Sequence, residues 1–275
     1  MPGVFTIHLQ MRFLNIASGS SGNATYIGTD HTHILIDAGI SRKRITEGLQ
    51  DADVTLSDID AILITHEHID HISSLGVLLR TREIPVYATK GTIDGILACP
   101  MLGSYPKDLF VPIEADRDFR IGDLSFLPLS ISHDANDPVC YRFSGNGRSG
   151  AVVTDLGIWN AYLEQNLQDL NFLMLEANHD RRMLEVGPYP YPLKRRIMGE
   201  KGHLSNEDAG LFLSQLLHDN MIRIMLGHIS RENNTREIAL LSVENEINGA
   251  DNPFHADDFD ILAARRDAAS QIFEV

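Results

Sequence analysis

The chain has 275 residues, 43% of them hydrophobic and 22% charged, so it is long and apolar enough to bury a sizeable core. Its formal net charge of −15 argues against a protein that coats nucleic acid, because such proteins are usually basic. No apolar run approaches the roughly 18 residues of a membrane span, and the first residues do not resemble a secretory signal peptide. We expect a cytoplasmic protein without a membrane partner, whose two cysteines, Cys99 and Cys140, stay reduced.

Short apolar runs, many of them β-branched, alternate along the chain with helix-like runs. Strands are predicted at 12–18, 33–37, 61–65, 84–89, 124–133, 139–143, 151–155, 171–177 and 222–228. Helices are predicted at 41–49, 72–82, 92–98, 161–167 and 205–218, the last with Ser205 as its N-cap. Residues 187–196 contain three prolines and are predicted to be irregular. No shift in composition marks a boundary, so one α/β domain is predicted over residues 1–275, with residues 1–10 as a possible extension.

Six of the predicted strands end in, or lead directly to, a side chain that binds metals well. These side chains are Asp37, His66, His133, Asp155, Glu176 and His228. In α/β proteins the loops at the carboxyl ends of the strands form the binding sites. The pattern therefore predicts that residues far apart in the sequence meet at one edge of the fold and form a metal centre.

The densest group of possible ligands is the stretch LITHEHIDHI, residues 63–72, which contains His66, His68, Asp70 and His71. A solvated, histidine-rich turn is one interpretation. Metal binding is favoured, because imidazoles and carboxylates are costly to cluster in a core without a cation. Side chains alternate along an extended chain, so His66 and His68 can share one ion. After a turn, Asp70 and His71 can reach a second ion.

Each ion then needs ligands from distant segments. His133 and His228 are the candidates for one each, and Asp155 could bridge both ions, although each of the three could instead be an ordinary buried or turn residue. The predicted ligands are His66, His68, His133 and Asp155 for one ion, and Asp70, His71, His228 and Asp155 for the other. Zinc or manganese is favoured for hydrolysis, and iron is also possible. Asp37 is expected to orient a ligand histidine.

The segment THEHIDH resembles the signature of the metallo-β-lactamase superfamily, and the ligands follow in that superfamily's order. Seven further segments are similar to the YycJ (WalJ) family of bacterial metallo-hydrolases: ASGSSGNAT, SHDANDPVCY, TDLG, EANHDRRML, GPYPYPLKRRI, GHLSNEDAG and GHISRENN. The resemblance runs from residue 11 to about residue 240, and the last 35 or so residues add little to it. It implies an αββα sandwich with a dinuclear site at the strand-end edge. It also implies a 5′-to-3′ DNA exonuclease linked to mismatch repair.

The same resemblance suggests catalytic residues. GHLSNEDAG is similar to a motif of RNase Z relatives in which a histidine helps to protonate the leaving oxygen, so His203 is the candidate general acid. The alternative is that His203 binds a phosphate or a neighbouring group at the start of a helix. Glu176 is expected to steer a metal ligand or Asp155, and Asp70 is counted among the catalytic residues as well as the ligands.

Candidate substrate-binding residues come from three segments. Ser20 and Asn23 belong to SGSSGN, which is either an anion-binding nest or a tight turn between strands. A basic run of three side chains, Lys194, Arg195 and Arg196, could hold a phosphodiester backbone or could simply be a solvated segment. Ser230, two residues after His228, is included in the same set.

These observations favour a dinuclear phosphodiesterase, most of all a DNA exonuclease that uses a metal-bridging hydroxide as its nucleophile. One alternative is a small-molecule cyclic phosphodiesterase, and another is an RNA-processing nuclease of the same fold. A non-catalytic regulatory module is disfavoured, because all seven candidate ligands are present.

Overall fold

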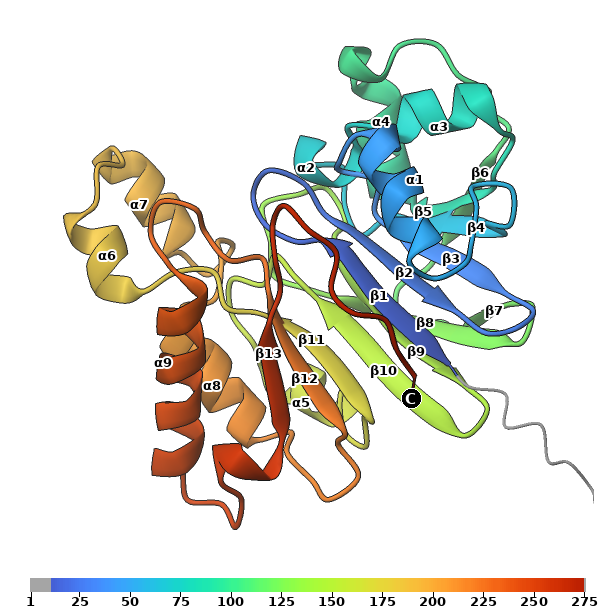
Figure 1. The fold of residues 1–275 in the computed structure, drawn as a ribbon. Helices are drawn as coiled ribbons and strands as arrows, with labels where there is room; N and C mark the ends of the chain where they lie inside the picture. The colour runs from blue at the N-terminus through green and yellow to red at the C-terminus, as the bar shows by residue number, and fades with distance from the viewer. Residues whose placement is uncertain (1–10, 275) are drawn as a thin grey trace, which may run out of the picture.

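The computed structural model describes residues 11–274, so the expectation for residues 1–10 lies outside the described residues. Two seven-stranded sheets face each other (Figure 1). The first sheet has the order β14 (Phe273–Glu274), β1 (Arg12–Ala17), β2 (Ala24–Gly28), β3 (His33–Ile36), β4 (Ala61–Leu63), β5 (Val86–Thr89) and β6 (Phe110–Ile113). The second has the order β13 (Asp260–Ala263), β12 (Arg223–Gly227), β11 (Phe172–Glu176), β10 (Arg148–Val153), β9 (Val139–Gly145), β8 (Leu124–Ser130) and β7 (Phe119–Ile121). Adjacent strands are parallel within the runs β3 to β6 and β10 to β13 and antiparallel in the other pairs of the two sheets.

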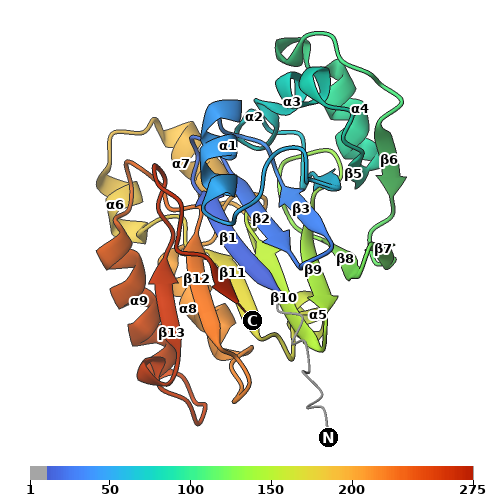
Figure 2. The ribbon, with the colours of Figure 1, turned by 45° about the vertical axis from the view of Figure 1, so that its right-hand side comes forward.

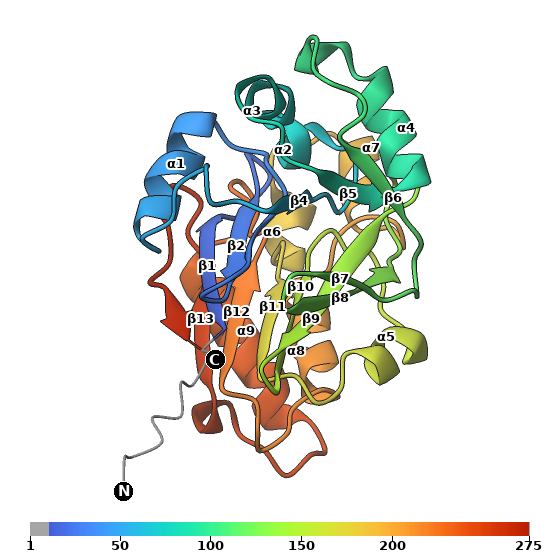
Figure 3. The same cartoon turned by 90° about the vertical axis from the view of Figure 1, so that its right-hand side faces the viewer.

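Helices cover the outer face of each sheet (Figures 1 and 3). The first sheet carries α1 (Arg42–Gln50), α2 (Ile69–Ile72), α3 (Leu75–Thr81) and α4 (Lys90–Ala98), with a 3₁₀ turn at Pro100–Leu102. The second carries α5 (Ala161–Asn166), α8 (Asn206–Ser214) and α9 (Arg236–Gly249), with a 3₁₀ turn at Ala256–Asp258. Two short helices, α6 (Arg181–Val186) and α7 (Tyr191–Ile197), stand apart from both sheets (Figures 1 and 2). None of the helices within residues 11–274 is long and apolar enough to cross a membrane.

Both faces of the central strands are buried, which explains their nearly continuous apolar sequences. In β3, Leu35 packs toward the helices, whereas Ile34 and Ile36 pack between the sheets. In β11, Leu173 packs toward helices and Met174 packs between the sheets. Three apolar layers result, one between the sheets and one under each helical layer, and the predicted αββα sandwich is confirmed.

Two local predictions are wrong. The proline-rich segment 187–196 contains most of α7, which begins at Tyr191. Proline is tolerated there because Pro192 lies in the first turn, where the backbone N–H has no partner within the helix. The single helix predicted at 72–82 is divided into α2 and α3, because the N–H of Ser74 donates to the carbonyl oxygen of Ala38 instead of continuing the helix.

The two cysteines are free, as expected, but they differ in burial. Cys140 in β9 is fully buried, and burial raises its pKa to about 12, whereas Cys99 is partly exposed. The thiolate is the reactive form of cysteine. We therefore expect a disulfide reagent at about pH 8 to titrate one thiol in the native protein and two after unfolding. Two rapidly reacting thiols in the native protein would contradict the burial of Cys140.

Candidate metal centre

The first predicted ligand group is assembled where the chain leaves β4. His66 is fully buried, His68 occupies the N-cap position of α2, and His133 reaches the same place from the loop after β8. The ring centroids are 4.6 Å apart for His66 and His68, 4.9 Å for His66 and His133, and 5.0 Å for His68 and His133. One nitrogen from each ring lies within 4.8 Å of the other two, so the three imidazoles could hold one ion.

The second predicted group lies beside the first. Asp70 and His71 belong to α2, and His228 follows β12 directly. Asp70 Oδ2 is 3.7 Å from His71 Nε2 and 3.6 Å from His228 Nε2. These three side chains also have ligand atoms within 4.8 Å of one another. The HxHxDH run thus contributes to two adjacent groups, which meet at His66 and His71, whose ring centroids are 4.1 Å apart and which form a further possible ligand group with Asp155.

Asp155 lies between the two groups and is almost fully buried. Its Oδ2 atom is 3.1 Å from His71 Nε2. Its Oδ1 atom is 3.5 Å from His228 Nε2 and 3.8 Å from His133 Nε2. One carboxylate therefore contacts histidines of both groups, which is the position that a bridging ligand requires.

Three of the residues at this edge have left-handed backbone conformations. The φ angles are 61° at Asp37, 60° at Asp155 and 50° at His228. Such angles are uncommon outside glycine, and aspartate and histidine are among the residues that tolerate them. At His228 the backbone N–H donates to Ser18 Oγ at 2.7 Å, which stabilises the bend. The bends follow β3, β10 and β12, and they bring side chains from three strands to one place.

Buried carboxylates orient the histidines from behind. Asp37 Oδ2 is 2.7 Å from His71 Nδ1, as the sequence leads one to expect, and the Thr65 hydroxyl donates to the same carboxylate. Glu176 Oε1 is 2.7 Å from His228 Nδ1 and 2.9 Å from His203 Nδ1. Glu176 therefore positions His228 and His203. Outer carboxylates of this kind fix the ring orientation of a ligand histidine.

The environment shifts the pKa values of the candidate ligands in different directions. Burial and the neighbouring His71 hold the pKa of His66 well below its ordinary value, which leaves the ring neutral. Burial opposes ionisation of Asp155, but the charges of His228 and His71 hold its pKa well below the usual range. Burial also opposes protonation of His228, yet Asp155 and other carboxyl groups raise its pKa to about 10. The carboxyl groups that raise the pKa of His228 would also attract a divalent cation, and neutral His66 offers it a free ring nitrogen.

Unsatisfied polar atoms test whether a metal fits. His66 Nε2, Asp155 Oδ2 and His228 Nε2 are buried and have no hydrogen-bond partner among residues 11–274. Buried polar atoms in native proteins are nearly always paired, because desolvation without a partner is costly. A cation coordinated by these atoms removes that cost, and imidazole and carboxylate ligands suit zinc and manganese. The clustered residues therefore form a site suited to divalent metal ions.

His203 adjoins this centre and lines a cavity of about 600 Å³. The cavity lies between the α6–α7 segment and the start of α8, and Tyr191, Lys194 and His179 also line it. The sequence does not predict a role for His179, whose buried Nδ1 atom has no partner within the described chain. Asp180, equally unassigned, caps α6 by accepting a hydrogen bond from the N–H of Met183.

The candidate residues of the glycine-rich segment form a turn between β1 and β2. The N–H of Gly22 donates to the carbonyl oxygen of Gly19 at 2.9 Å, so the turn interpretation is the one observed. Asn23 is buried, and its amide nitrogen is 3.0 Å from His71 Nε2. Ser20 is exposed at the tip of the turn. Asn23 thus ties the turn to the ligand run.

The three residues of the basic run, Lys194, Arg195 and Arg196, have different surroundings. Lys194 donates to the carbonyl oxygen of Glu185, and Arg196 forms an ion pair with Asp134. Asp134 Oδ1 lies 3.5 Å from His133 Nε2, which places Arg196 near the first ligand group. Arg195 is exposed. Sequence reasoning missed Asp134 and Thr65, although each directly adjoins a predicted ligand.

We expect Asp37→Asn to weaken metal binding by about 10- to 100-fold, since it removes the charge that orients His71. Asparagine tolerates the left-handed backbone at this position, so the fold should be retained. Competition with a chelator measures the affinity. Asp53→Asn is the matched control, because Asp53 also has a positive φ, of 55°, and lies in the loop after α1. Equal affinities of the Asp37 variant and the control would contradict the role of Asp37.

Residues 32–229 match the family model described as the beta-lactamase superfamily domain. The chain belongs to this superfamily. Within it, the chain is 38% identical to Exodeoxyribonuclease YycJ of Bacillus anthracis over 233 residues, which cover 85% of this chain and 88% of the relative. It is 36% identical to Exodeoxyribonuclease WalJ of Streptococcus pneumoniae serotype 2 over 260 residues, covering 94% and 96%. The predicted YycJ/WalJ-type membership is confirmed.

Solved structures support the fold. The metallo-beta-lactamase fold protein YhfI from Bacillus subtilis superposes with a TM-score of 0.73 at 13% identity, covering 97% of this chain and all of that one. Zn²⁺-bound PqqB from Methylobacterium extorquens gives a TM-score of 0.67 at 15% identity, covering 94% and 99%. Membership of the YycJ/WalJ-type family, together with the ligand cluster, makes this chain a metal-dependent hydrolase.

Proposed function

We propose that this protein is a cytoplasmic DNA exonuclease that hydrolyses phosphodiesters with two divalent metal ions, zinc or manganese, and acts from 5′ to 3′ in DNA repair. The observation that carries the proposal is the pair of adjacent ligand groups joined by Asp155. His66 Nε2, Asp155 Oδ2 and His228 Nε2 are buried there without a hydrogen-bond partner in the described part of the chain. The two relatives named exodeoxyribonuclease match nearly the whole chain and support DNA as the substrate. Free thiols at Cys99 and Cys140 are typical of a reducing compartment.

In this proposal His66, His68 and His133 would hold one ion, Asp70, His71 and His228 would hold the other, and Asp155 would contribute to both. When bound, such a pair would supply a lowered pKa for water and positive charge for the phosphate. The protein's own task is to fix the ligands, through Asp37 and Glu176, and to supply a proton to the departing oxygen.

His203 is placed for that proton transfer. Glu176 accepts a hydrogen bond from Nδ1 of His203, so Nε2 is the atom that can donate to a leaving alkoxide. The ring lines the cavity beside the metal ligands, where the leaving group of a bound phosphodiester would lie. Lys194 lines the same cavity as His203. In this proposal Arg195 and Arg196, its neighbours in α7, contact phosphates of the nucleic-acid strand.

The test is digestion of end-labelled single- and double-stranded DNA and RNA, with 5′-hydroxyl and 5′-phosphate ends, under zinc and under manganese. We expect stepwise release of nucleotides from the 5′ end of DNA. A cyclic nucleotide is included, since a cavity of about 600 Å³ could also hold a mononucleotide-sized substrate. Turnover of the cyclic nucleotide without digestion of any polynucleotide would replace the exonuclease with a small-molecule phosphodiesterase.

A further inference from the structure

A second cavity, of about 520 Å³, lies next to the metal centre and is lined by four arginines. We call it the arginine pocket and define it by Arg231, Arg236, Arg265 and Arg266. Asp267 is the one acidic residue in its lining. This excess of positive charge occurs in a chain whose net charge is −15. Like charges repel at close range, so such a group is favourable when an anion binds between its members.

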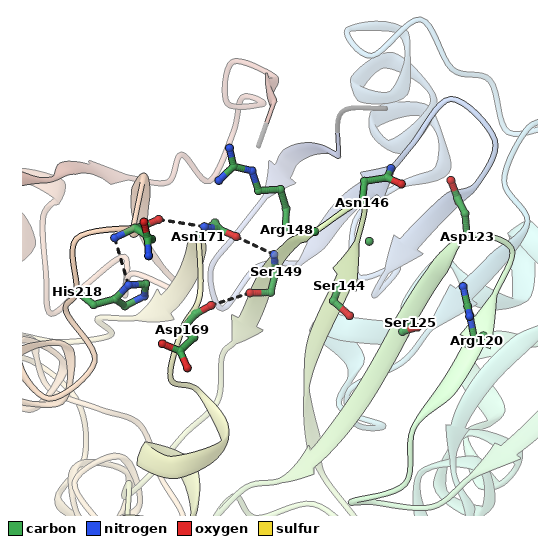
Figure 4. Close-up of a pocket in the computed structure, with 13 residues that line it drawn as sticks. Arg120, Asp123, Ser125, Ser144, Asn146, Arg148, Ser149, Asp169, Asn171 and His218 are labelled. Carbon is green, nitrogen blue, oxygen red and sulfur yellow. Dashed lines mark hydrogen bonds between the residues drawn. The ribbon is translucent and has the colours of Figure 1, made fainter. Parts of the chain in front are cut away.

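The two cavities that are larger than the arginine pocket do not share this charge. The cavity beside His203 is lined by two cationic residues, Arg181 and Lys194, and two acidic ones, Glu185 and Asp208. A cavity of about 610 Å³ at the amino ends of β10 and β11 likewise combines two arginines and two aspartates: Arg120, Arg148, Asp123 and Asp169 (Figure 4). Only the arginine pocket, among these three, has a net positive lining.

Two of the four arginines are hydrogen-bonded to the backbone. Arg266 donates to the carbonyl oxygen of Ile229 at 3.0 Å, and Arg236 donates to that of Ala263 at 3.1 Å. The side chain of Arg266 also lies against Gly19, where a Cβ atom would come within 3.3 Å of Arg266 Nε. Arg231, Arg236 and Arg265 are exposed, Arg266 is partly buried, and Arg231 Nε lies 3.8 Å from Glu232 Oε1. The pocket therefore has two arginines bonded to the backbone and two others accessible at its surface.

A helix adds to the positive potential. Thr235, the N-cap of α9, and Arg236, its first residue, both line the arginine pocket. The helix has 14 residues, and its amino end carries a partial positive charge from the aligned peptide dipoles. Helix amino ends of this kind favour phosphate groups.

The pocket adjoins the backbone segment that carries His228, a candidate metal ligand. Ser18 lines the pocket, and its Oγ accepts the hydrogen bond from the N–H of His228. Ile229 and Ser230, the next two residues after His228, also line it. Consecutive Cα atoms are about 3.8 Å apart, so the pocket begins within one or two residues of a candidate metal ligand.

We propose that the arginine pocket binds a phosphate group of the nucleic-acid strand, adjacent to the phosphodiester that is cut. The proposal rests on the proposed nuclease function and assigns it a substrate-binding site that involves residues 231–267. Arginine suits this role, because its planar guanidinium group can donate two parallel hydrogen bonds to phosphate oxygens. Phosphate binding in this pocket would also give a role to Ser230, a candidate substrate-binding residue that lines the pocket.

The test compares two double variants of the metal-loaded full chain. Arg231→Gln with Arg265→Gln removes two exposed arginines without breaking the backbone contacts of Arg236 or Arg266. Arg120→Gln with Arg148→Gln is the matched control, since both of these arginines are exposed and line the cavity of Figure 4. The kcat and KM are measured on labelled single-stranded DNA between about 50 and 200 mM salt, and on bis(p-nitrophenyl) phosphate, which has no second phosphate. The DNA carries either a terminal phosphate or a terminal hydroxyl.

We expect the pocket variant to lose about tenfold in kcat/KM on DNA, mainly through KM, with a weaker dependence on salt. Its activity on the small diester, and both activities of the control, should match the unmodified protein. A loss confined to DNA with a terminal phosphate identifies that phosphate as the ligand. An equal loss on DNA with a terminal phosphate and on DNA with a terminal hydroxyl identifies an internal phosphate. Unchanged KM and salt dependence on DNA would overturn the proposal.

Failure of the proposed function is a separate result. If the unmodified protein hydrolyses the small diester but does not cut DNA, the nuclease function fails. The arginine pocket is then judged by fluorescence anisotropy with the same oligonucleotides, because uncut DNA gives a direct Kd. A tenfold higher Kd for the pocket variant than for the control supports phosphate binding, and equal values refute it.

Discussion

Asp155→Asn is expected to lower phosphodiester hydrolysis by about a thousandfold or more and to release at least one bound ion. Asp155 contacts histidines of both ligand groups, so the loss of its charge weakens both sites at once. Loss of an ion that stabilises a developing charge is worth several kcal/mol, and about 4 kcal/mol corresponds to a thousandfold in rate. The measurements are kcat/KM on bis(p-nitrophenyl) phosphate and the metal content of the same preparation.

Asp169→Asn is the control for this experiment. Asp169 also has a left-handed backbone, with φ of 58°. It is exposed and lines the cavity at the amino ends of β10 and β11, whereas the candidate ligands lie at the carboxyl ends of the strands. Asparagine tolerates this backbone in both variants, so the comparison isolates the carboxylate. Full turnover by the Asp155 variant, with its metal retained, would show that Asp155 is not needed as a metal ligand.

His203→Ala is expected to lower kcat on DNA by about 10²- to 10⁴-fold, the range typical of a lost general acid. The loss should be much smaller on bis(p-nitrophenyl) phosphate, because p-nitrophenolate leaves without needing a proton. Circular dichroism and metal content, which should equal those of the unmodified protein, exclude a structural cause.

The kinetic pattern separates the two interpretations of His203. If His203 binds a phosphate of the substrate instead of donating a proton, its replacement should raise KM on DNA and leave kcat largely intact. Equal losses of kcat on DNA and on the activated diester would also contradict proton donation.

The sequence predicts the ligand set because the relevant pattern is local. Asp155 and His228 each follow an apolar strand, and side-chain alternation relates His66 to His68. Both clues can be recognised in short stretches of sequence. What these patterns do not reveal is the second contact of each side chain. The pairing of Glu176 with both His203 and His228 depends on three segments meeting in space.

The strands that the sequence fails to predict are mostly those at the sheet edges. Strands β6, β7, β13 and β14 end the two sheets, and they are short and partly exposed, so their apolar pattern is weak. Strand β2 is central and fully buried, but its sequence ATYIG combines only a few strand-forming residues and ends in Gly28. Helix α9 was not predicted either, although its buried residues Ala239, Val243 and Ile247 recur every four positions, which is a helical pattern.

The arginine pocket shows why the C-terminal residues matter more than their sequence suggests. Arg265 and Arg266 follow an edge strand, and Arg236 begins α9. Nothing in their spacing relates them to His228. They meet because β13 pairs with β12, the strand that leads to His228. Parallel pairing of this kind joins residues distant in sequence, and a single sequence carries little sign of it.

Metal analysis of the purified full chain is the decisive measurement. Elemental mass spectrometry, on protein loaded with zinc or manganese and freed of excess metal, should give close to two ions per chain. Asp169→Asn should give the same value, and Asp155→Asn should give one or none. A reproducible value of one ion in the unmodified protein would show that the two ligand groups do not hold separate ions.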